Sequence, residues 1–225
     1  MATSDDRRTP LRKDARRNRE TLITAAREVY AERGVDAPLD EIARRAGVGN
    51  ATLYRHFASR AELIEAVFRD SLTPLLRAAE ESRAHPDPWA GLTAYVDRVF
   101  TLLAADRGAN DLMTTGMQGV PTLEALHEGN RHTLDVLLRR AQQQAAVRAD
   151  IGVEDLLFLL TALGRAVPAV PGSWRRYLAL LLDALRPATA HPLPGPPLSP
   201  DQSGAALRRL DPAPGTGSSR DRPTR

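Results

Sequence analysis

Apolar residues recur at helical spacing along most of the chain, and no stretch shows the alternation expected of a half-buried strand. In residues 14–33 they fall three and four positions apart, which is the period of one helical face (Leu22, Ile23, Ala26, Val29, Tyr30). The same spacing predicts helices at about 40–46, 50–57 and 60–76, and others beginning near Trp89 and Pro121. The predicted fold class is therefore all-α.

Two later segments are apolar on nearly every helical face. They lie at 153–167, which contains DLLFLLTAL, and at 173–185, which contains WRRYLALLLDAL. A helix that is apolar all round must be covered all round. A helical bundle shared by two subunits is the simplest cover, and burial within one subunit is the alternative. We therefore expect a homodimer formed through about 153–186.

Breaks in the pattern divide the chain. Pro74 falls inside the helix predicted at 60–76, where a missing hydrogen bond predicts a kink or a break. Residues 188–225 are rich in Pro, Gly and Ser, so a disordered tail is expected there. Residues 1–13 are polar and basic, which predicts a flexible arm.

Composition narrows the class of protein. A chain of 225 residues with 42% hydrophobic content can bury a real core. The absence of cysteine excludes disulfides, thiolate nucleophiles and the usual zinc frameworks, and favours a reducing, cytoplasmic location. No apolar run approaches the roughly 18 residues of a membrane span, and the polar N-terminus does not resemble a signal peptide.

The charge is unevenly placed. The net charge is only +3, with an isoelectric point near 9.8. Much of the excess lies near the N-terminus (Arg7, Arg8, Arg12, Lys13, Arg16, Arg17, Arg19). A basic arm of this kind points to a polyanionic partner, and a merely solvated tail is the alternative.

The segment DEIARRAGVGNATLYRHFASRAEL, residues 40–63, joins two short helical patterns by a glycine turn. Ala43 lies four residues before Gly47, and Leu53 lies six residues after it. Alanine lets a second helix approach closely, and glycine permits the sharp turn. This spacing predicts a helix-turn-helix.

The second helix of this motif has two faces. Leu53 and Phe57 are one turn apart and face inward, whereas the outer face carries polar side chains (Asn50, Thr52, Tyr54, Arg55, His56). Arginine pairs bidentately with guanine and asparagine with adenine, so Arg55 and Asn50 are candidate base readers. The other three side chains can donate to phosphate oxygens. Double-stranded DNA is the predicted partner.

Residues 16–63 resemble the DNA-binding domain of the TetR family of bacterial transcriptional regulators, most plainly in LDEIARRAGVGNATLYRHFASRAELIEAV. The resemblance implies that Tyr54, His56 and the basic Arg60 contact phosphates. It implies that Asn50, Ala51 and Arg55 read bases. Two positions depart from the family pattern: Gly49 replaces the usual capping serine, and Pro38 stands where threonine often begins the preceding helix.

The resemblance also implies a DNA-binding domain at 14–60 and a helical effector-binding and dimerisation domain at 61–187. The candidate pocket residues of that second domain are aromatic, methionine and polar side chains (Phe100, Met113, Met117, Gln118, His127, Arg131). Methionine adapts to irregular apolar ligands, and ordinary core filling is its alternative role. A hydrated helix face is the alternative for His127 and Arg131.

Enzyme chemistry finds little support in the sequence. The five histidines are scattered, and GxGxxG, P-loop, HExxH and GxSxG motifs do not occur, so no cofactor and no metal site is expected. An architectural protein that binds DNA regardless of sequence is a second alternative, which the long second domain disfavours. The sequence predicts a homodimeric regulator, a repressor that binds a partly palindromic operator and is released by a small-molecule effector.

Overall fold

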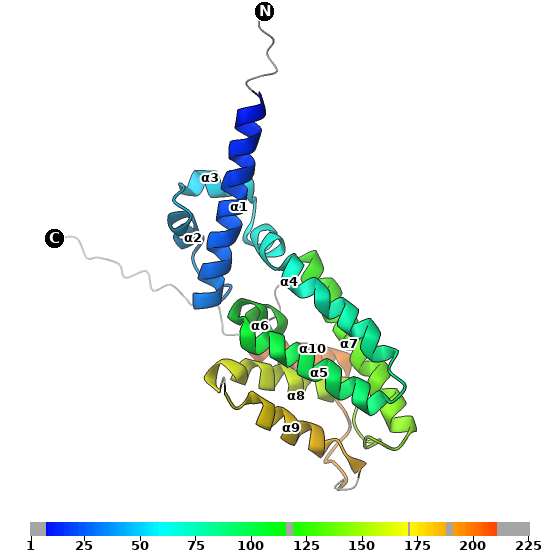
Figure 1. The fold of residues 1–225 in the computed structure, drawn as a ribbon. Coiled ribbons are helices and arrows are strands. Elements are labelled where there is room, and N and C mark those ends of the chain that lie inside the picture. The colour runs from blue at the N-terminus through cyan, green and yellow to red at the C-terminus, as the bar shows by residue number, and fades with distance from the viewer. Residues whose placement is uncertain (1–7, 116–118, 171, 188–190, 211–225) are drawn as a thin grey trace, which may run out of the picture.

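The computed structural model describes residues 8–115, 119–170, 172–187 and 191–210, and the regular elements within these ranges are all helices (Figure 1). They follow in the order α1 (Arg8–Arg33), α2 (Leu39–Arg45), α3 (Asn50–His56), α4 (Arg60–Arg83), α5 (Pro88–Ala105), α6 (Arg107–Thr114), α7 (Pro121–Gln143), α8 (Val153–Ala166), the 3₁₀ turn η1 (Val167–Ala169), α9 (Trp174–Ala184) and α10 (Pro200–Leu210). The all-α prediction is confirmed.

The first three helices pack in one apolar core that continues into α4, α6 and α7. Tyr30 of α1, Ile42 of α2 and Leu53 of α3 are almost completely buried, and Phe57 at the end of α3 lies among them. Gly47 links α2 to α3 with φ of 69°, a left-handed conformation that most side chains disfavour. This is the helix-turn-helix that the spacing of Ala43, Gly47 and Leu53 predicts.

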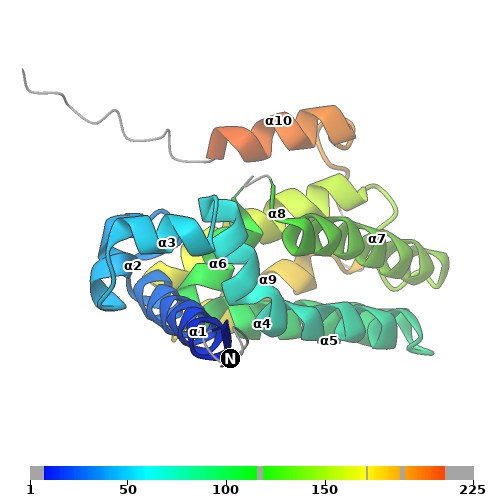
Figure 2. The same ribbon diagram turned by 90° about the horizontal axis from the view of Figure 1, so that it is seen from above.

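Helix α4 leads from this small domain into a larger helical bundle. Ser59 caps it by accepting a hydrogen bond from the Glu62 backbone N–H at 3.1 Å. Helices α4, α5 and α7 run side by side, and α8 and α9 cover one side of them (Figures 1 and 2). The second core is built from α5, α7, α8 and α9, with Leu92, Leu137 and Leu156 fully buried.

Pro74 does not interrupt α4, which is a single helix from Arg60 to Arg83. The break allowed for by the sequence pattern is therefore absent. Proline costs one backbone hydrogen bond, but Leu72 and Leu75 on either side are buried at 1% and 5% exposure. Their packing stabilises the helix on both sides of the proline.

Both predicted tails differ from the structure. Helix α1 begins at Arg8, so residues 8–13 of the predicted arm are helical, whereas residues 1–7 lie outside the described part of the chain. Proline has no backbone N–H. Pro10 is tolerated there because the N–H groups in the first turn of a helix make no hydrogen bond within the helix. Within the predicted disordered tail, Pro200–Leu210 forms α10. Ser199 and Gln202 cap its start reciprocally, with N–H to side-chain oxygen distances of 2.9 and 3.3 Å.

No helix in the described ranges is both long enough and apolar enough to cross a membrane.

Candidate nucleic-acid interface and effector cavity

The outer face of α3 presents the predicted base readers to solvent. Tyr54 is 53% exposed, and Ala51 and Arg55 are exposed beside it. Thr52 is half-buried. In Figure 2, α3 lies beside α2 and α1 at one end of the molecule. A single exposed stripe on a short helix has the shape that enters a major groove.

Asn50 is already hydrogen bonded. Its side-chain N–H donates to the Asp40 carboxylate of α2 at 2.8 Å, and both residues are exposed. Asparagine reads adenine with its amide N–H and its carbonyl oxygen together. The Asp40 contact uses one of the two side-chain N–H groups of Asn50, which leaves the other N–H and the Oδ1 atom available for a base.

The remaining candidate DNA contacts are less accessible than the sequence pattern implies. The Nε2 atom of His56 is buried and has no hydrogen-bond partner in the structure. The Arg60 guanidinium turns inward, and its Nη1 donates to the carbonyl oxygens of Val35 and Ala37, both at 2.7 Å. Arg60 thus ties α4 to the loop between α1 and α2. A buried tyrosine lies nearby: desolvation raises the pKa of Tyr30 to about 12, and the Arg60 charge opposes that rise.

Two arginines near α3, Arg19 and Arg45, have different partners. The Arg19 guanidinium of α1 lies 4.9 Å from the centre of the Phe57 ring, which places this basic turn of α1 beside the end of α3. Arg45 of α2 is instead engaged with Glu32 at 2.8 Å and with Glu28 at 3.4 Å. Arg45 is therefore paired with acidic residues of α1, whereas Arg19 lies beside the end of α3.

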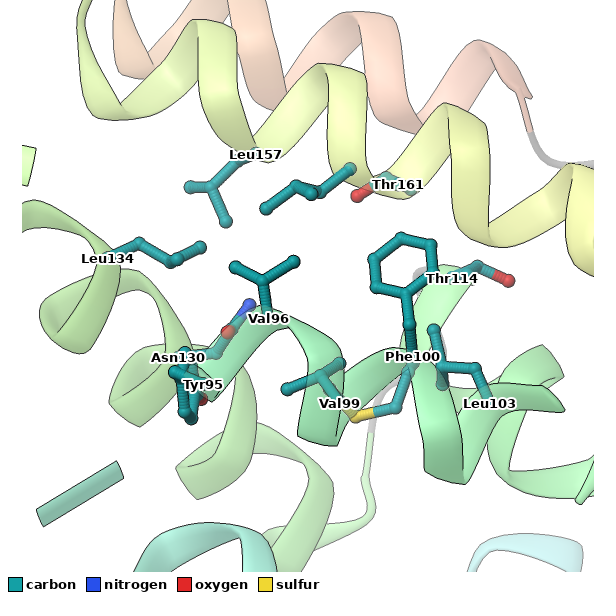
Figure 3. A pocket seen from close by; sticks show the side chains of 12 residues that line it. Tyr95, Val96, Val99, Phe100, Leu103, Thr114, Asn130, Leu134, Leu157 and Thr161 are labelled. Carbon is teal, nitrogen blue, oxygen red and sulfur yellow. The ribbon is translucent and has the colours of Figure 1, made fainter. Parts of the chain in front are cut away.

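A small, mostly apolar cavity lies inside the second domain. Figure 3 shows Leu157 and Thr161 projecting from α8 toward Val96, Val99 and Phe100 of α5. The wall is completed by α6 and α7 and by neighbouring residues of α5 and α8 (Tyr95, Leu103, Met113, Thr114, Asn130, Leu134, Leu160). Mostly apolar walls with a few polar groups are typical of small-molecule sites.

A second, outer chamber adjoins this cavity and shares Met113, Thr114, Asn130, Leu157 and Thr161 with it. It adds polar side chains from α7 and α8 and one face of α10 (His127, Arg131, Glu154, Pro200, Ser203, Gly204, Leu207). Four of the predicted pocket residues therefore line the two chambers: Phe100, Met113, His127 and Arg131. Met117 and Gln118 lie outside the described residues.

The polar side chains of the outer chamber form a nearly neutral set. Arg131 donates to the Glu154 carboxylate at 2.5 and 3.1 Å, and the Glu154 side chain is only 10% exposed. Burial lowers the pKa of His127, while a hydrogen bond to the Met113 backbone opposes this shift. A neutral His127 that donates from one ring nitrogen keeps the other as an acceptor.

Helix α6 connects the cavity to the DNA-binding domain. Its C-terminal end carries Met113 and Thr114 in the cavity wall, and the Thr114 carbonyl accepts from Arg165 of α8 at 2.6 Å. From the same helix, Asp111 accepts from the Val35 N–H at 3.3 Å and Arg107 donates to the Glu32 carbonyl at 3.1 Å.

Desolvation raises the pKa of Asp111, and the Val35 hydrogen bond opposes the rise. The helix is tightly held, because a Cβ atom at Gly108 would lie 2.5 Å from the Phe68 ring of α4. A shift of α6 must therefore move α4 or the loop after α1.

Apolar side chains remain exposed on α8 and α9. Leu159 is 45% exposed, Tyr177 43% and Leu180 55%. Leu159 and Ala162 are three residues apart on α8, as Tyr177 and Leu180 are on α9, so each pair forms one helical stripe. We call these four residues the α8–α9 face.

Within the described residues, no three His, Asp or Glu side chains are grouped as metal ligands.

Two family models match most of the described helical part of the chain. Residues 22–67 match the family model described as bacterial regulatory proteins, tetR family. Residues 87–187 match the model described as transcriptional regulator SbtR-like, C-terminal domain. The chain belongs to the TetR family. It is thus a helix-turn-helix, DNA-binding transcriptional regulator, and the resemblance seen in residues 16–63 is confirmed.

Relatives agree with this assignment. TtgR of Pseudomonas putida, an HTH-type transcriptional regulator, is 32% identical over 140 residues, which are 60% of this chain and 61% of TtgR. The HTH-type transcriptional activator FasR of Mycolicibacterium smegmatis is 38% identical over 98 residues, 43% of this chain and 44% of FasR. This TetR-family chain therefore spans less than two thirds of the length of these curated relatives.

Solved structures extend the comparison. The TetR transcriptional regulator SCO0520 from Streptomyces coelicolor is 31% identical, with 76% of this chain and 99% of that chain covered and a TM-score of 0.49. The regulator FadR from Bacillus subtilis, solved in complex with stearoyl-CoA, is 18% identical, with 76% and 99% covered and a TM-score of 0.56. At that identity FadR shows a shared fold alone.

Several residues of the two sites escaped the sequence analysis of this TetR-family chain. The inner wall at Val96, Leu157 and Thr161 carries ordinary helical apolar spacing, so no local signal separates it from core. The contacts of Asp111 and Arg107 join residues about 75 positions apart, which periodicity cannot detect. The start of α10 did carry a signal in SPDQ, a reciprocal cap preceding a short helix.

Proposed function

We propose that this TetR-family regulator is a homodimeric repressor that leaves its operator when a small molecule occupies the cavity between α5, α6, α7 and α8. The observation that carries the proposal is the position of α6. One end of this helix forms cavity wall at Met113 and Thr114. Asp111 binds the loop that leads into the helix-turn-helix, and Arg107 binds the C-terminal end of α1.

Dimerisation is proposed through the α8–α9 face. Exposed leucine and tyrosine side chains in two neighbouring helices favour burial against an apolar partner. A second copy offers the same surface, and a two-fold axis makes such a surface complementary to itself. The dimer would carry two copies of α3.

Operator recognition is proposed to use both copies of α3. In a two-fold dimer, recognition helices about 34 to 36 Å apart enter successive major grooves on one side of the duplex. Arg55 would read guanine, Ala51 would contact a base edge, and Tyr54 and Thr52 would donate to phosphates. The operator is then partly palindromic, with half-sites one helical turn apart.

Release is proposed to follow from differential binding. A ligand shifts a conformational equilibrium only by the ratio of its affinities for the two states. A ligand seated against Met113 and Thr114 favours the position of α6 that accommodates it. Because Asp111 binds the loop between α1 and α2 and Arg107 binds the C-terminal end of α1, that position sets the spacing of the two α3 helices.

Repression follows from occupancy, since a dimer that covers a promoter excludes RNA polymerase. Among the relatives FasR is an activator, so activation is the second candidate function. The two are separated by a reporter gene placed downstream of the selected operator. The proposal expects expression to fall when this protein is produced and to recover when an effector enters the cavity.

The experiment measures operator binding by fluorescence anisotropy while a panel of apolar small molecules is added. Wild type is expected to leave the operator with at least one member. Asp111→Ala should bind that compound with unchanged affinity and yet remain on the operator, because the link between α6 and Val35 is cut. Glu128→Ala, an exposed change on α7, is the matched control and should behave as wild type. Full release by Asp111→Ala would contradict the proposed route.

A further inference from the structure

The C-terminal helix α10 lies across the outer chamber of the cavity. Four of its residues line that chamber, Pro200, Ser203, Gly204 and Leu207, and they fall on one stripe of the helix. Figure 2 shows α10 lying on the outside of α8. The outer chamber is therefore closed on one side by a segment that follows the dimerisation helices in the chain.

Little apolar packing fastens α10. Among its side chains that the structure describes, at 200–207 and 209, Ser203 alone is buried, and Leu207 is half-buried. Opening a segment costs roughly the apolar burial and the hydrogen bonds that it gives up, so a helix of this composition opens far below the cost of global unfolding.

Ser203 is an unusual residue to bury in this position. It is 1% exposed, and its hydroxyl has no hydrogen-bond partner. A buried hydroxyl without a partner is unfavourable, and such groups are few in native proteins. Ser203 lines the same chamber as His127, Arg131 and Glu154. A ligand's polar group in that chamber would supply the missing partner.

We propose that α10 is a lid over the cavity, and that the Ser203 hydroxyl binds the hydroxyl head of an apolar ligand whose body fills the inner chamber. The inference rests on the proposed function, because it assigns ligand chemistry and an entry route to the same cavity.

The chamber favours a neutral head over a charged one. Arg131 and Glu154 already neutralise each other, so neither sign of charge gains an unpaired partner. A hydroxyl group both accepts and donates, which matches a serine donor and the acceptor nitrogen of a neutral imidazole. The inner walls from α5 and α8 accept an apolar body.

The first part of the test compares two probes that differ in one group, 4-hydroxybiphenyl and 4-methylbiphenyl, on the full chain by calorimetry. Wild type is expected to prefer the hydroxyl probe by about tenfold, as one buried hydrogen bond allows. Ser203→Ala should reduce that preference to about twofold while binding of the methyl probe stays the same. An equal preference in wild type and Ser203→Ala would overturn the role of Ser203.

The second part uses the absence of native cysteine, which lets one introduced thiol report the motion of α10. Ser203→Cys is expected to react with a maleimide about a hundredfold more slowly than Arg209→Cys, an exposed position on the same helix. Saturating 4-hydroxybiphenyl should slow Ser203→Cys further and leave Arg209→Cys unchanged. Leu207→Cys, a second lining position, repeats the measurement if Ser203→Cys folds poorly.

The outcomes separate the lid from the proposed function. Equal reaction rates at 203, 207 and 209, unaffected by the probe, would overturn the lid. Failure of both probes to bind would overturn the ligand chemistry, even if another compound releases the operator. Probe binding and thiol protection as expected, without release of operator DNA by any cavity ligand, would support the lid and contradict the proposed function.

Discussion

The role of Arg60 differs between the family resemblance and the structure, and a substitution there tests which role is correct. The resemblance makes Arg60 a phosphate contact, whereas the structure directs its Nη1 into two hydrogen bonds of 2.7 Å with the Val35 and Ala37 carbonyls. Removing a charged donor costs roughly 1.5 to 3 kcal/mol for each hydrogen bond. Because Arg60 is half-buried and water can replace it in part, the lower value applies to both bonds. Arg60→Ala is therefore expected to lower the free energy of unfolding by about 3 kcal/mol.

The measurement is calorimetric unfolding at fixed protein concentration, since dimers unfold in a concentration-dependent way. A loss of about 3 kcal/mol lowers the melting temperature of a chain this long by roughly 6 to 12 °C. Arg60→Lys keeps the charge but not the guanidinium fork, so it should recover only part of the loss. Arg69→Ala, which removes an exposed arginine of the same helix, is the control.

DNA binding supplies the contrasting readout. A phosphate contact contributes close to one unit to the slope of log binding constant against log salt concentration. The structure predicts that Arg60→Ala leaves this slope unchanged at a temperature where the variant is folded. A slope reduced by about one, with stability within about 0.5 kcal/mol of wild type, would refute the reasoning and restore Arg60 as a phosphate contact.

Three further predictions follow from the two sites. Arg55→Ala should weaken the free energy of operator binding by about 1 to 3 kcal/mol and relax the preference at one base step, as measured on single-base operator variants. An equal loss of binding free energy on random duplexes would contradict base reading by Arg55. Leu180→Glu places like charges together at the proposed two-fold interface. It should raise the dimer dissociation constant at least about a hundredfold in sedimentation experiments, with Arg98→Glu as the control. An unchanged dissociation constant would show that the α8–α9 face is not the interface. Burial lowers the pKa of His127, so its unfolded form takes up a proton below about pH 6.5 before the folded form does. Wild type should therefore lose stability relative to His127→Gln as the pH falls below about 6.5, and parallel stability curves would show that His127 is not buried in solution.

The helix-turn-helix could be predicted from sequence because each part of it is local. Ala43, Gly47 and Leu53 lie within eleven positions, and the glycine has the positive φ that the turn requires. Side-chain partners across the same motif could not be predicted. The contact between Asn50 and Asp40 depends on how α2 and α3 cross, which spacing alone does not determine.

The second domain shows the same division. Helical periodicity predicts α5, α7, α8 and α9, but it does not distinguish side chains that face a cavity from those that fill a core. Phe100 and His127 were found by residue type, whereas Val96 and Thr161 were not. Composition was misleading at α10, because the proline-rich residues around 191–200 obscured the cap at Ser199 that begins the helix.

The most direct test of the central claim is selection of duplexes from a random pool by the purified full-length protein, followed by sequencing across a salt series. The account predicts an enriched, two-fold symmetric site whose half-sites lie one helical turn apart, with binding that weakens steeply as salt increases. Enrichment of an asymmetric single site would contradict the proposed dimer. Binding that depends on salt without any enriched sequence would contradict base reading by α3 and favour an architectural role.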